Sequence, residues 1–198
     1  MAVAVVNSGG ANISSVLHAL RRLGAEPRFT ADAKTIGAAD HVILPGVGAA
    51  GRAMDVLRSH GLTKVIRKLT QPVLGICLGM QLLFDSSEED DTRLLGLIPA
   101  RLDRLSQAEG LRVPHMGWNA ITNKRDDPLT DPLNHKWFYF VHSYAAPVGN
   151  WTLSASTHGK AFSAIVRKDN FYGAQFHPER SAKAGAELLR GFLETALK

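Results

Sequence analysis

The single cysteine of this 198-residue chain, Cys77, lies in the segment Gly75-Ile-Cys77-Leu-Gly79. The short apolar run Pro72–Ile76 before it is typical of a buried strand, and helical spacing then continues to Phe84. A tight strand-to-helix turn flanked by glycines is a nucleophile elbow, which lifts the central side chain out of the sheet. A thiol placed there meets free N–H groups at a helix N-terminus, which favour the thiolate and can stabilise an oxyanion. Cys77 alone also fits a small buried apolar residue.

A candidate base for this thiol lies one hundred residues further on, in the segment Phe171–Glu179. Its first six residues predict a strand, and Pro178 biases His177 toward an extended backbone. Because residues two apart in an extended segment share a face, Glu179 can hold one imidazole nitrogen while the other faces the thiol. Cys77, His177 and Glu179 therefore predict a nucleophile, a base and an orienting acid. A solvated His-Pro-Glu loop is the alternative, and the accompanying cysteine turn argues against it.

Strands and helices alternate along the part of the chain that must position these residues. Apolar, β-prone segments predict strands at Ala2–Val6, Pro27–Thr30 and His41–Leu44. Helical spacing follows in Val16–Leu23, Ala49–Ser59 and Leu62–Leu69. This order predicts an α/β fold, a mostly parallel doubly wound sheet with helices on both faces and its site at the strand C-termini.

The second half of the chain has a different pattern. From Leu94 the period becomes strand-like, which predicts antiparallel strands appended to the parallel sheet, and Ser181 begins a final helix. The segments Asp85–Thr92 and Lys124–Asn134 predict solvated surface loops. With no repeat, low-complexity segment or linker, we expect one domain spanning residues 1–198.

Composition narrows the class of protein. A hydrophobic content of 45% and a charged content of 21% are ordinary for a globular domain, and one cysteine excludes an internal disulfide. No signal peptide or membrane-spanning run is present, so we expect a cytoplasmic protein that does not enter a membrane. The net charge of +5 comes from scattered basic residues without interleaved aromatics, so we expect no nucleic acid as a partner. A docking face for an acidic partner or a phosphorylated substrate stays a weaker option.

The two chemical motifs together resemble the class I glutamine amidotransferases, whose triad is Cys-His-Glu in this chain order. Two further stretches, Leu44-Pro-Gly-Val-Gly48 and Pro114-His-Met-Gly-Trp-Asn119, are similar to the glutaminase subunits of imidazole glycerol phosphate synthase, from histidine biosynthesis. The resemblance covers essentially the whole chain. It implies hydrolysis of L-glutamine through a Cys77 thioester. The ammonia would pass to a (β/α)8-barrel cyclase subunit in a heterodimer, which makes imidazole glycerol phosphate and aminoimidazole carboxamide ribonucleotide. No metal or organic cofactor is implied.

The resemblance also implies roles outside the triad. The backbone N–H groups of Val47 and Leu78 would form the oxyanion hole. Residues of three segments would bind glutamine: Gly46, Gly48, Gln81, His142, Ser143 and Tyr144. The partner interface would contain Asn12, Met116, Trp118, Asn119 and Arg180. Without the resemblance, Met116 and Trp118 would be core residues and His142 a satisfied histidine at a strand end.

The chain departs from the family pattern at three positions. Asn7 and Ser8 replace the usual Asp-Tyr of the first loop, and Arg180 replaces a lysine, keeping the charge but not the geometry. These departures bear on coupling to the partner rather than on the chemistry. Glycines at 46 and 48 also suggest a strained oxyanion loop that flips on activation.

Three other functions remain open from the sequence. One is a sister amidotransferase that feeds another synthase, against which the Pro114–Asn119 stretch argues. Another is a related cysteine hydrolase or peptidase, which the substrate of the acyl-enzyme would reveal. The last is a non-catalytic binding subunit, against which the intact Cys77, His177 and Glu179 argue.

Overall fold

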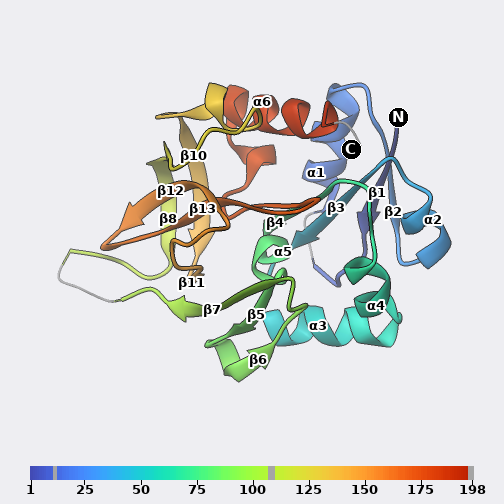
Figure 1. The fold of residues 1–198 in the computed structure, drawn as a ribbon, viewed down its shortest axis with the longest axis horizontal. Helices are drawn as coiled ribbons and strands as arrows, with labels where there is room; N and C mark the ends of the chain where they lie inside the picture. Colours follow the sequence, from blue (N-terminus) through green and yellow to red (C-terminus); the bar gives the residue numbers. More distant parts are fainter. Residues whose placement is uncertain (11–12, 107–109, 196–198) are drawn as a thin grey trace.

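An eight-stranded sheet forms the centre of the computed structural model, which describes residues 1–10, 13–106 and 110–195 (Figure 1). The strands lie in the order β2-β1-β3-β4-β14-β13-β12-β9. The first five run parallel and the last three antiparallel. Their bounds are β1 Ala2–Val6, β2 Glu26–Thr30, β3 His41–Gly46, β4 Val73–Cys77, β9 Thr122–Asn123, β12 Thr152–His158, β13 Lys160–Lys168 and β14 Phe171–Ala174.

Helices cover both faces of this sheet, because successive side chains of a buried strand point to opposite sides. Val3 and Val5 of β1 pack in one core cluster with α1 and α6, whereas Ala4 and Val6 pack in a second with α2, α3 and α4. In Figure 1, α1 and α6 lie on one side of the sheet and α3 and α4 on the other. The helices are α1 Ile13–Arg22, α2 Ala33–Gly37, α3 Ala50–Ser59, α4 Leu62–Arg67, α5 Leu78–Gln81 and α6 Ala182–Leu193. The predicted doubly wound α/β class is confirmed.

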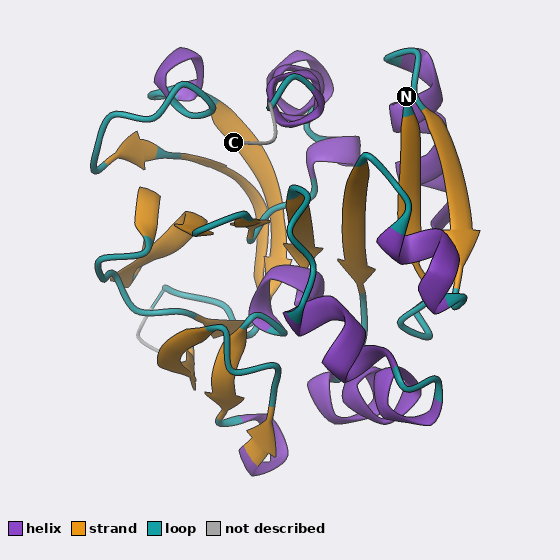
Figure 2. Ribbon diagram, turned by 45° about the vertical axis from the view of Figure 1, so that its right-hand side comes forward, coloured by secondary structure: helices purple, strands orange, loops and turns teal. Residues whose placement is uncertain are grey.

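Two smaller sheets extend the fold beside the central one (Figure 2). β8 (His115–Ala120) and β10 (Trp137–His142) form an antiparallel ribbon. β11 (Tyr144–Ala145) is antiparallel to β7 (Ile98–Arg104), which in turn pairs with β5 (Phe84–Ser87). β6 (Thr92–Arg93) completes that sheet. The appended strands are thus confirmed, although β5 and β7 run parallel to each other.

The helix after Cys77 is shorter than the sequence predicts. α5 ends at Gln81, and Phe84 instead begins β5. Every residue from Leu78 to Phe84 is buried, so the helical spacing of the apolar residues carried no information about which face they present. With one turn of helix the macrodipole is small, and the local N–H groups remain the feature that can act on the thiol.

Both predicted surface loops are more structured than expected. The acidic segment contributes β5, β6 and a 3-10 turn, η1 (Glu89–Asp91), and Glu88 accepts a hydrogen bond from Arg104 N. In the second segment Asp127 is buried and pairs with Arg167 at 2.8 Å. A short 3-10 turn, η2 (Asp131–Leu133), follows it and buries Leu133. Composition alone predicts that these carboxylates are solvated, but Glu88 and Asp127 are bonded to other groups of the protein instead.

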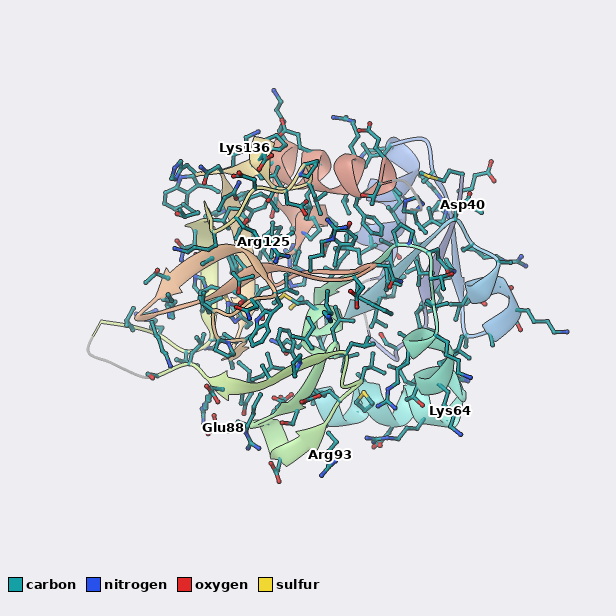
Figure 3. All side chains as sticks on the ribbon, viewed as in Figure 1. Asp40, Lys64, Glu88, Arg93, Arg125 and Lys136 are labelled. Carbon is teal, nitrogen blue, oxygen red and sulfur yellow. The ribbon has the colours of Figure 1, made fainter. Side chains whose placement is uncertain are left out.

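The charged side chains are spread over the surface. In Figure 3, Lys64, Arg93, Arg125 and Lys136 lie at separate places on the molecule. Within the described residues, none of the helices combines the length and apolarity that crossing a membrane would take.

Candidate active site

Cys77 lies at the sharp turn between β4 and α5, in a backbone conformation that is rare for residues other than glycine. Its φ is 53° and its ψ −110°. Such strain persists only where the surrounding packing imposes it. A Cβ on Gly79 would lie 1.7 Å from Leu44 O, and one on Gly75 2.5 Å from Gly79 O. Gly75 therefore leaves room for the backbone of the turn itself, as the sequence predicts, and Gly79 allows the turn to pack directly against β3.

His177 follows β14, and its imidazole contacts the carboxylate of Glu179. His177 Nδ1 donates to Glu179 Oε1 at 2.8 Å. The backbone of His177 is extended, as expected, but Glu179 lies in a 3-10 turn, η3 (Pro178–Arg180), rather than in an extended segment. The predicted contact between His177 and Glu179 is present. The predicted extended backbone at Glu179 was wrong, because Pro178 starts a 3-10 turn. The contact assigns the Nδ1 proton and leaves Nε2 for the thiol.

This pair is largely buried. The Glu179 side chain is 3% exposed, and its Oε2 has no hydrogen-bond partner among the described residues. His177 is therefore the group that compensates the carboxylate. Burial lowers the pKa of His177, but hydrogen bonds and charges from Cys77 and Glu179 outweigh burial and raise it to about 10. At neutral pH the imidazole thus favours its protonated form.

The strand β10 holds His177 in place. His177 N donates to Tyr139 O at 2.9 Å. The Ser181 hydroxyl also links the backbones of these two residues. That hydroxyl donates to His177 O at 2.7 Å and accepts from Tyr139 N at 3.0 Å. Position 177 is therefore anchored by its main chain as well as by its side chain.

A cavity of about 290 Å³ opens beside the thiol. Most of the residues predicted for the nucleophile, the base, the oxyanion hole and glutamine binding line it: Val47, Gly48, Cys77, Leu78, Gln81, His142, Ser143, Tyr144 and His177. Gly46 does not line it, and a Cβ there would lie 2.9 Å from Gly79 N. Gly46 is thus required for packing between β3 and the cysteine turn. The cavity has the size of a small-molecule site.

The loop after β3 carries the predicted oxyanion donor Val47. Gly48 has φ +95°, which favours glycine, and Val47 is exposed. Ser8 is buried, and its hydroxyl donates to Pro45 O at 2.6 Å. The departure from the family pattern at position 8 therefore places a hydroxyl directly against the strand end that leads into this loop.

The predicted glutamine-binding histidine uses both ring nitrogens inside the protein. His142 Nδ1 donates to Tyr144 O at 2.9 Å, and its Nε2 lies 3.0 Å from His115 Nδ1. Both ring nitrogens are engaged within the protein, whereas the residue itself lines the cavity, so its role in glutamine binding stays a prediction. Gln81 Nε2 donates to Tyr144 O at 2.9 Å and to Gln175 Oε1 at 3.1 Å.

The expected interface residues divide between the two faces of the β8–β10 ribbon. Met116 and Trp118 are 64% and 51% exposed, so neither is a core residue. Trp118 packs edge-on against Tyr139, and the Arg180 guanidinium lies 5.1 Å from the same tyrosine ring. Asn119 points to the opposite face and donates to Thr157 O, so its side chain is not part of this surface. Asn12 lies outside the described residues.

Sequence reasoning missed three side chains around the site. Glu89 lines the cavity and accepts from Ala50 N at 2.8 Å, at the start of α3. Gln175 is fully buried, with Nε2 4.0 Å from Cys77 Sγ. His115 is buried behind His142. Gln175 could have been found, since it lies two residues before His177 and its segment reads as a strand; the other two depend on tertiary contacts.

The described residues contain no group of three or more His, Cys, Asp or Glu side chains arranged to hold a metal ion. The chemistry that the arrangement supports is nucleophilic attack by a thiol assisted by an imidazole and a carboxylate.

Comparison with known proteins agrees with this geometry. The family model "Glutamine amidotransferase class-I" matches residues 4–196. A relative from Xanthomonas axonopodis pv. citri (strain 306), named "Imidazole glycerol phosphate synthase subunit HisH", is 51% identical over 193 residues, 97% of this chain and 96% of the relative. The protein of the same name from Idiomarina loihiensis is 50% identical over 197 residues, the full length of both chains.

Solved structures show the same fold at lower identity. One titled "Crystal structure of glutamine amidotransferase" aligns with a TM-score of 0.76, at 21% identity and 98% coverage of both chains. Another, "Structure of PurLQS from Thermotoga maritima", aligns with a TM-score of 0.74 at 20% identity, also over 98% of both chains.

Proposed function

The chain belongs to the class I glutamine amidotransferase family, and from this premise we propose how its site works. It is an enzyme, the glutaminase subunit of imidazole glycerol phosphate synthase in histidine biosynthesis, and it acts with a cyclase subunit. Our proposal is that Cys77, His177 and Glu179 are its triad, and that residues 1–198 form one amidotransferase domain. The observation that carries it is the strained Cys77 turn sharing one cavity with a His177 that is bonded to a buried Glu179.

The proposed reaction proceeds through a thioester. The proton shared by Cys77 and His177 lies on the imidazole, and the Cys77 sulfur forms a bond to the side-chain amide carbon of glutamine. The resulting oxyanion accepts hydrogen bonds from the N–H groups of Val47 and Leu78. The carbon–nitrogen bond then breaks as the His177 imidazolium protonates the departing ammonia. Water, deprotonated by His177, attacks the thioester and releases glutamate.

The proposed glutamine contacts are the cavity-lining Gly48, Gln81, Ser143 and Tyr144, with His142 acting behind them. Gly46 contributes by packing rather than by contact. The cavity's volume of about 290 Å³ suits a free amino acid better than a peptide segment, which argues against a peptidase. The buried, bonded triad argues against a non-catalytic binding subunit.

We propose that the cyclase subunit is a (β/α)8 barrel and that it docks on the outer face of the β8–β10 ribbon. Antiparallel partners share a face, so Met116 lies beside Val141, and Val141 also lines the cavity. The exposed apolar surface therefore begins at the cavity rim, where released ammonia would leave. Trp118, with Arg180 over Tyr139, extends that surface. Exposed aromatics and arginine are typical anchors of protein interfaces. A cytoplasmic location remains a prediction.

The test is glutamine hydrolysis by the purified chain, alone and with the cyclase subunit and its ligand. We expect weak activity alone and strong stimulation by both together. Cys77→Ala should abolish hydrolysis and leave the use of free ammonium by the complex intact. Hydrolysis that persists in Cys77→Ala rules out the triad, and hydrolysis indifferent to the cyclase subunit points to a different synthase.

A further inference from the structure

Two buried histidines on the inner face of the β8–β10 ribbon have a single possible arrangement of protons when both are neutral. His142 Nδ1 faces the carbonyl of Tyr144 and must donate, so His142 Nε2 is an acceptor. His115 Nδ1, 3.0 Å from that atom, must therefore donate to it. His115 Nε2 is then an acceptor and meets the amide of Asn119 at 3.3 Å.

The Asn119 amide is itself fixed in orientation. Its Oδ1 accepts from Ala120 N at 2.9 Å, and its Nδ2 also donates to Thr157 O at 2.9 Å. The nitrogen is thus the atom that faces His115, in agreement with the proton positions deduced from the other end. Every hydrogen bond in this series has one donor and one acceptor, so adding a proton to either histidine places two donors opposite each other.

At one end, this series of hydrogen bonds extends from His142 to the Cys77 thiol. Tyr144 O accepts from His142 and also from Gln81, so both of its lone pairs are used and the orientation of its peptide group is fixed. Gln81 donates its second hydrogen to Gln175, whose own amide nitrogen lies 4.0 Å from Cys77 Sγ. The hydrogen bonds therefore run from Asn119 to the side of the nucleophile.

The other end of the hydrogen-bond series, at His115 and Asn119, lies behind the exposed face of the ribbon. His115 and Asn119 alternate along β8 with Met116 and Trp118, so the same strand carries the buried chain on one side and the exposed apolar surface on the other. A small displacement of β8 changes the distance between His115 and His142, because these residues are direct cross-strand partners.

We propose that His115 is a positioning residue for glutamine binding, an inference that rests on the proposed function. Acting through His142, it fixes the Tyr144 carbonyl and with it the Gln81 side chain, which line the glutamine cavity. Through Asn119 it ties this arrangement to the strand on which the cyclase subunit docks. His115 lines no part of that cavity and takes no part in the chemistry.

The first test is the proton position in the wild-type chain. Nitrogen-15 NMR of the imidazole rings should show both His115 and His142 neutral, with the proton on Nδ1. A proton on Nε2 of either ring overturns the proposal, because the chain of donors and acceptors then does not exist.

The second test separates the hydrogen bond from the packing. His115→Phe keeps the ring that stacks on Phe140 but removes the donor, whereas His115→Asn places an amide nitrogen where Nδ1 was. Loss of one such bond predicts a KM for glutamine about 5- to 10-fold higher in His115→Phe, with kcat within about twofold. His115→Asn should restore KM to within about twofold of wild type.

The matched control is His158→Phe. His158 stacks on His115 with ring centroids 4.2 Å apart, but its own nitrogen bonds Arg112 O outside the chain described above. Its replacement should leave KM unchanged. An unchanged KM in His115→Phe, or an equal rise in His115→Asn, contradicts the role of His115. A wild-type chain that hydrolyses no glutamine contradicts the proposed function instead.

Discussion

At the scale of single residues, the site depends on a buried charge pair. Glu179 accepts a hydrogen bond from His177 Nδ1, and it opposes the effect of burial on the pKa of the imidazole. Without the carboxylate, burial would disfavour the imidazolium form of His177. The orientation of the ring would also be lost, since Nδ1 has this carboxylate as its side-chain partner.

Glu179→Gln should therefore lower the pKa of His177 and reduce kcat/KM for glutamine by about 100-fold or more, with a smaller change in KM. Steady-state kinetics, together with an NMR titration of His177, measure both effects. A kcat/KM close to wild type, or a His177 pKa that stays near 10, would show that the carboxylate does not orient or charge the base. Glu187→Gln is the control: this half-buried carboxylate on α6 pairs with Lys136 and lines no part of the cavity, so the kinetics should stay unchanged.

At the scale of elements, the cysteine turn is built by close approach of two backbones. β3, β4 and α5 meet at Gly75 and Gly79, where a single added carbon would overlap main-chain atoms. Backbone atoms of central strands cannot move away as the end of a flexible side chain can. The strained conformation of Cys77 is thus sustained by the sheet and not by the turn alone.

Gly79→Ala should lower the free energy of unfolding by more than about 3 kcal/mol, because its Cβ would lie 1.7 Å from Leu44 O. Urea denaturation measures the change. Gly37→Ala is the control, since a Cβ there meets nothing within 4 Å, and it should be within about 0.5 kcal/mol of wild type. Equal stability of both variants would contradict the packing argument.

The β8–β10 ribbon is the element proposed to contact the cyclase subunit. Trp118→Ala should reduce stimulation by that subunit at least 10-fold, as expected for an interface anchor, because the side chain is 51% exposed and contributes little to the core. Basal hydrolysis and thermal stability should change little. Phe29→Ala is the matched control: this side chain is 42% exposed on β2, at the other end of the central sheet.

Binding of the cyclase subunit to immobilised variants completes that comparison. If Trp118→Ala binds and responds as wild type does, the docking surface lies elsewhere. Loss of response in Phe29→Ala as well would show that the effect is general and not specific to the ribbon.

At the scale of the whole molecule, buried neutral histidines make stability depend on pH. Burial lowers the pKa of His115 to about 4 and that of His142 to about 3. The hydrogen bond to Tyr144 O opposes this effect at His142, while repulsion from His158 adds to it at both rings and repulsion from His115 adds to it at His142. His177 also faces His142, and burial lowers the pKa of His41, which packs against Phe192 of α6. In the unfolded chain these groups have a pKa near 6.5.

Below pH 6.5 the unfolded state therefore binds protons that the folded state does not. The free energy of unfolding decreases as the pH is lowered, until the folded pKa values are reached. Each histidine contributes up to about 1.4 kcal/mol per pH unit in this range. His177 has a raised pKa and stays protonated in both states well below pH 6.5, so it adds nothing there.

Urea denaturation at several values between pH 6.5 and 5 tests this dependence, above the range in which carboxylates titrate. His115→Phe should reduce the slope by about 1 kcal/mol per pH unit, while the exposed His60→Gln should leave it unchanged. A wild-type stability that is flat over this range would mean that the histidines are not buried as neutral groups.

The sequence by itself determined the α/β class, the order of strands and helices, and the family, because these depend on local spacing and on short motifs. The spacing around Cys77 and the His177–Glu179 motif were enough to locate the candidate site, since each is a local pattern. Local patterns failed where burial was complete, as in α5, or where a distant segment supplied a partner, as Arg167 does for Asp127.

Tertiary structure alone decided which side of a strand each site residue faces and what it meets there. Asn119 and His142, expected at the interface and in the glutamine site, are engaged in internal hydrogen bonds, while Met116 and Trp118, ordinary core residues by type, are exposed. The reason is physical: a side chain's role depends on neighbours brought together from β8, β10 and β12, and contacts between distant segments leave no periodic signal in the sequence.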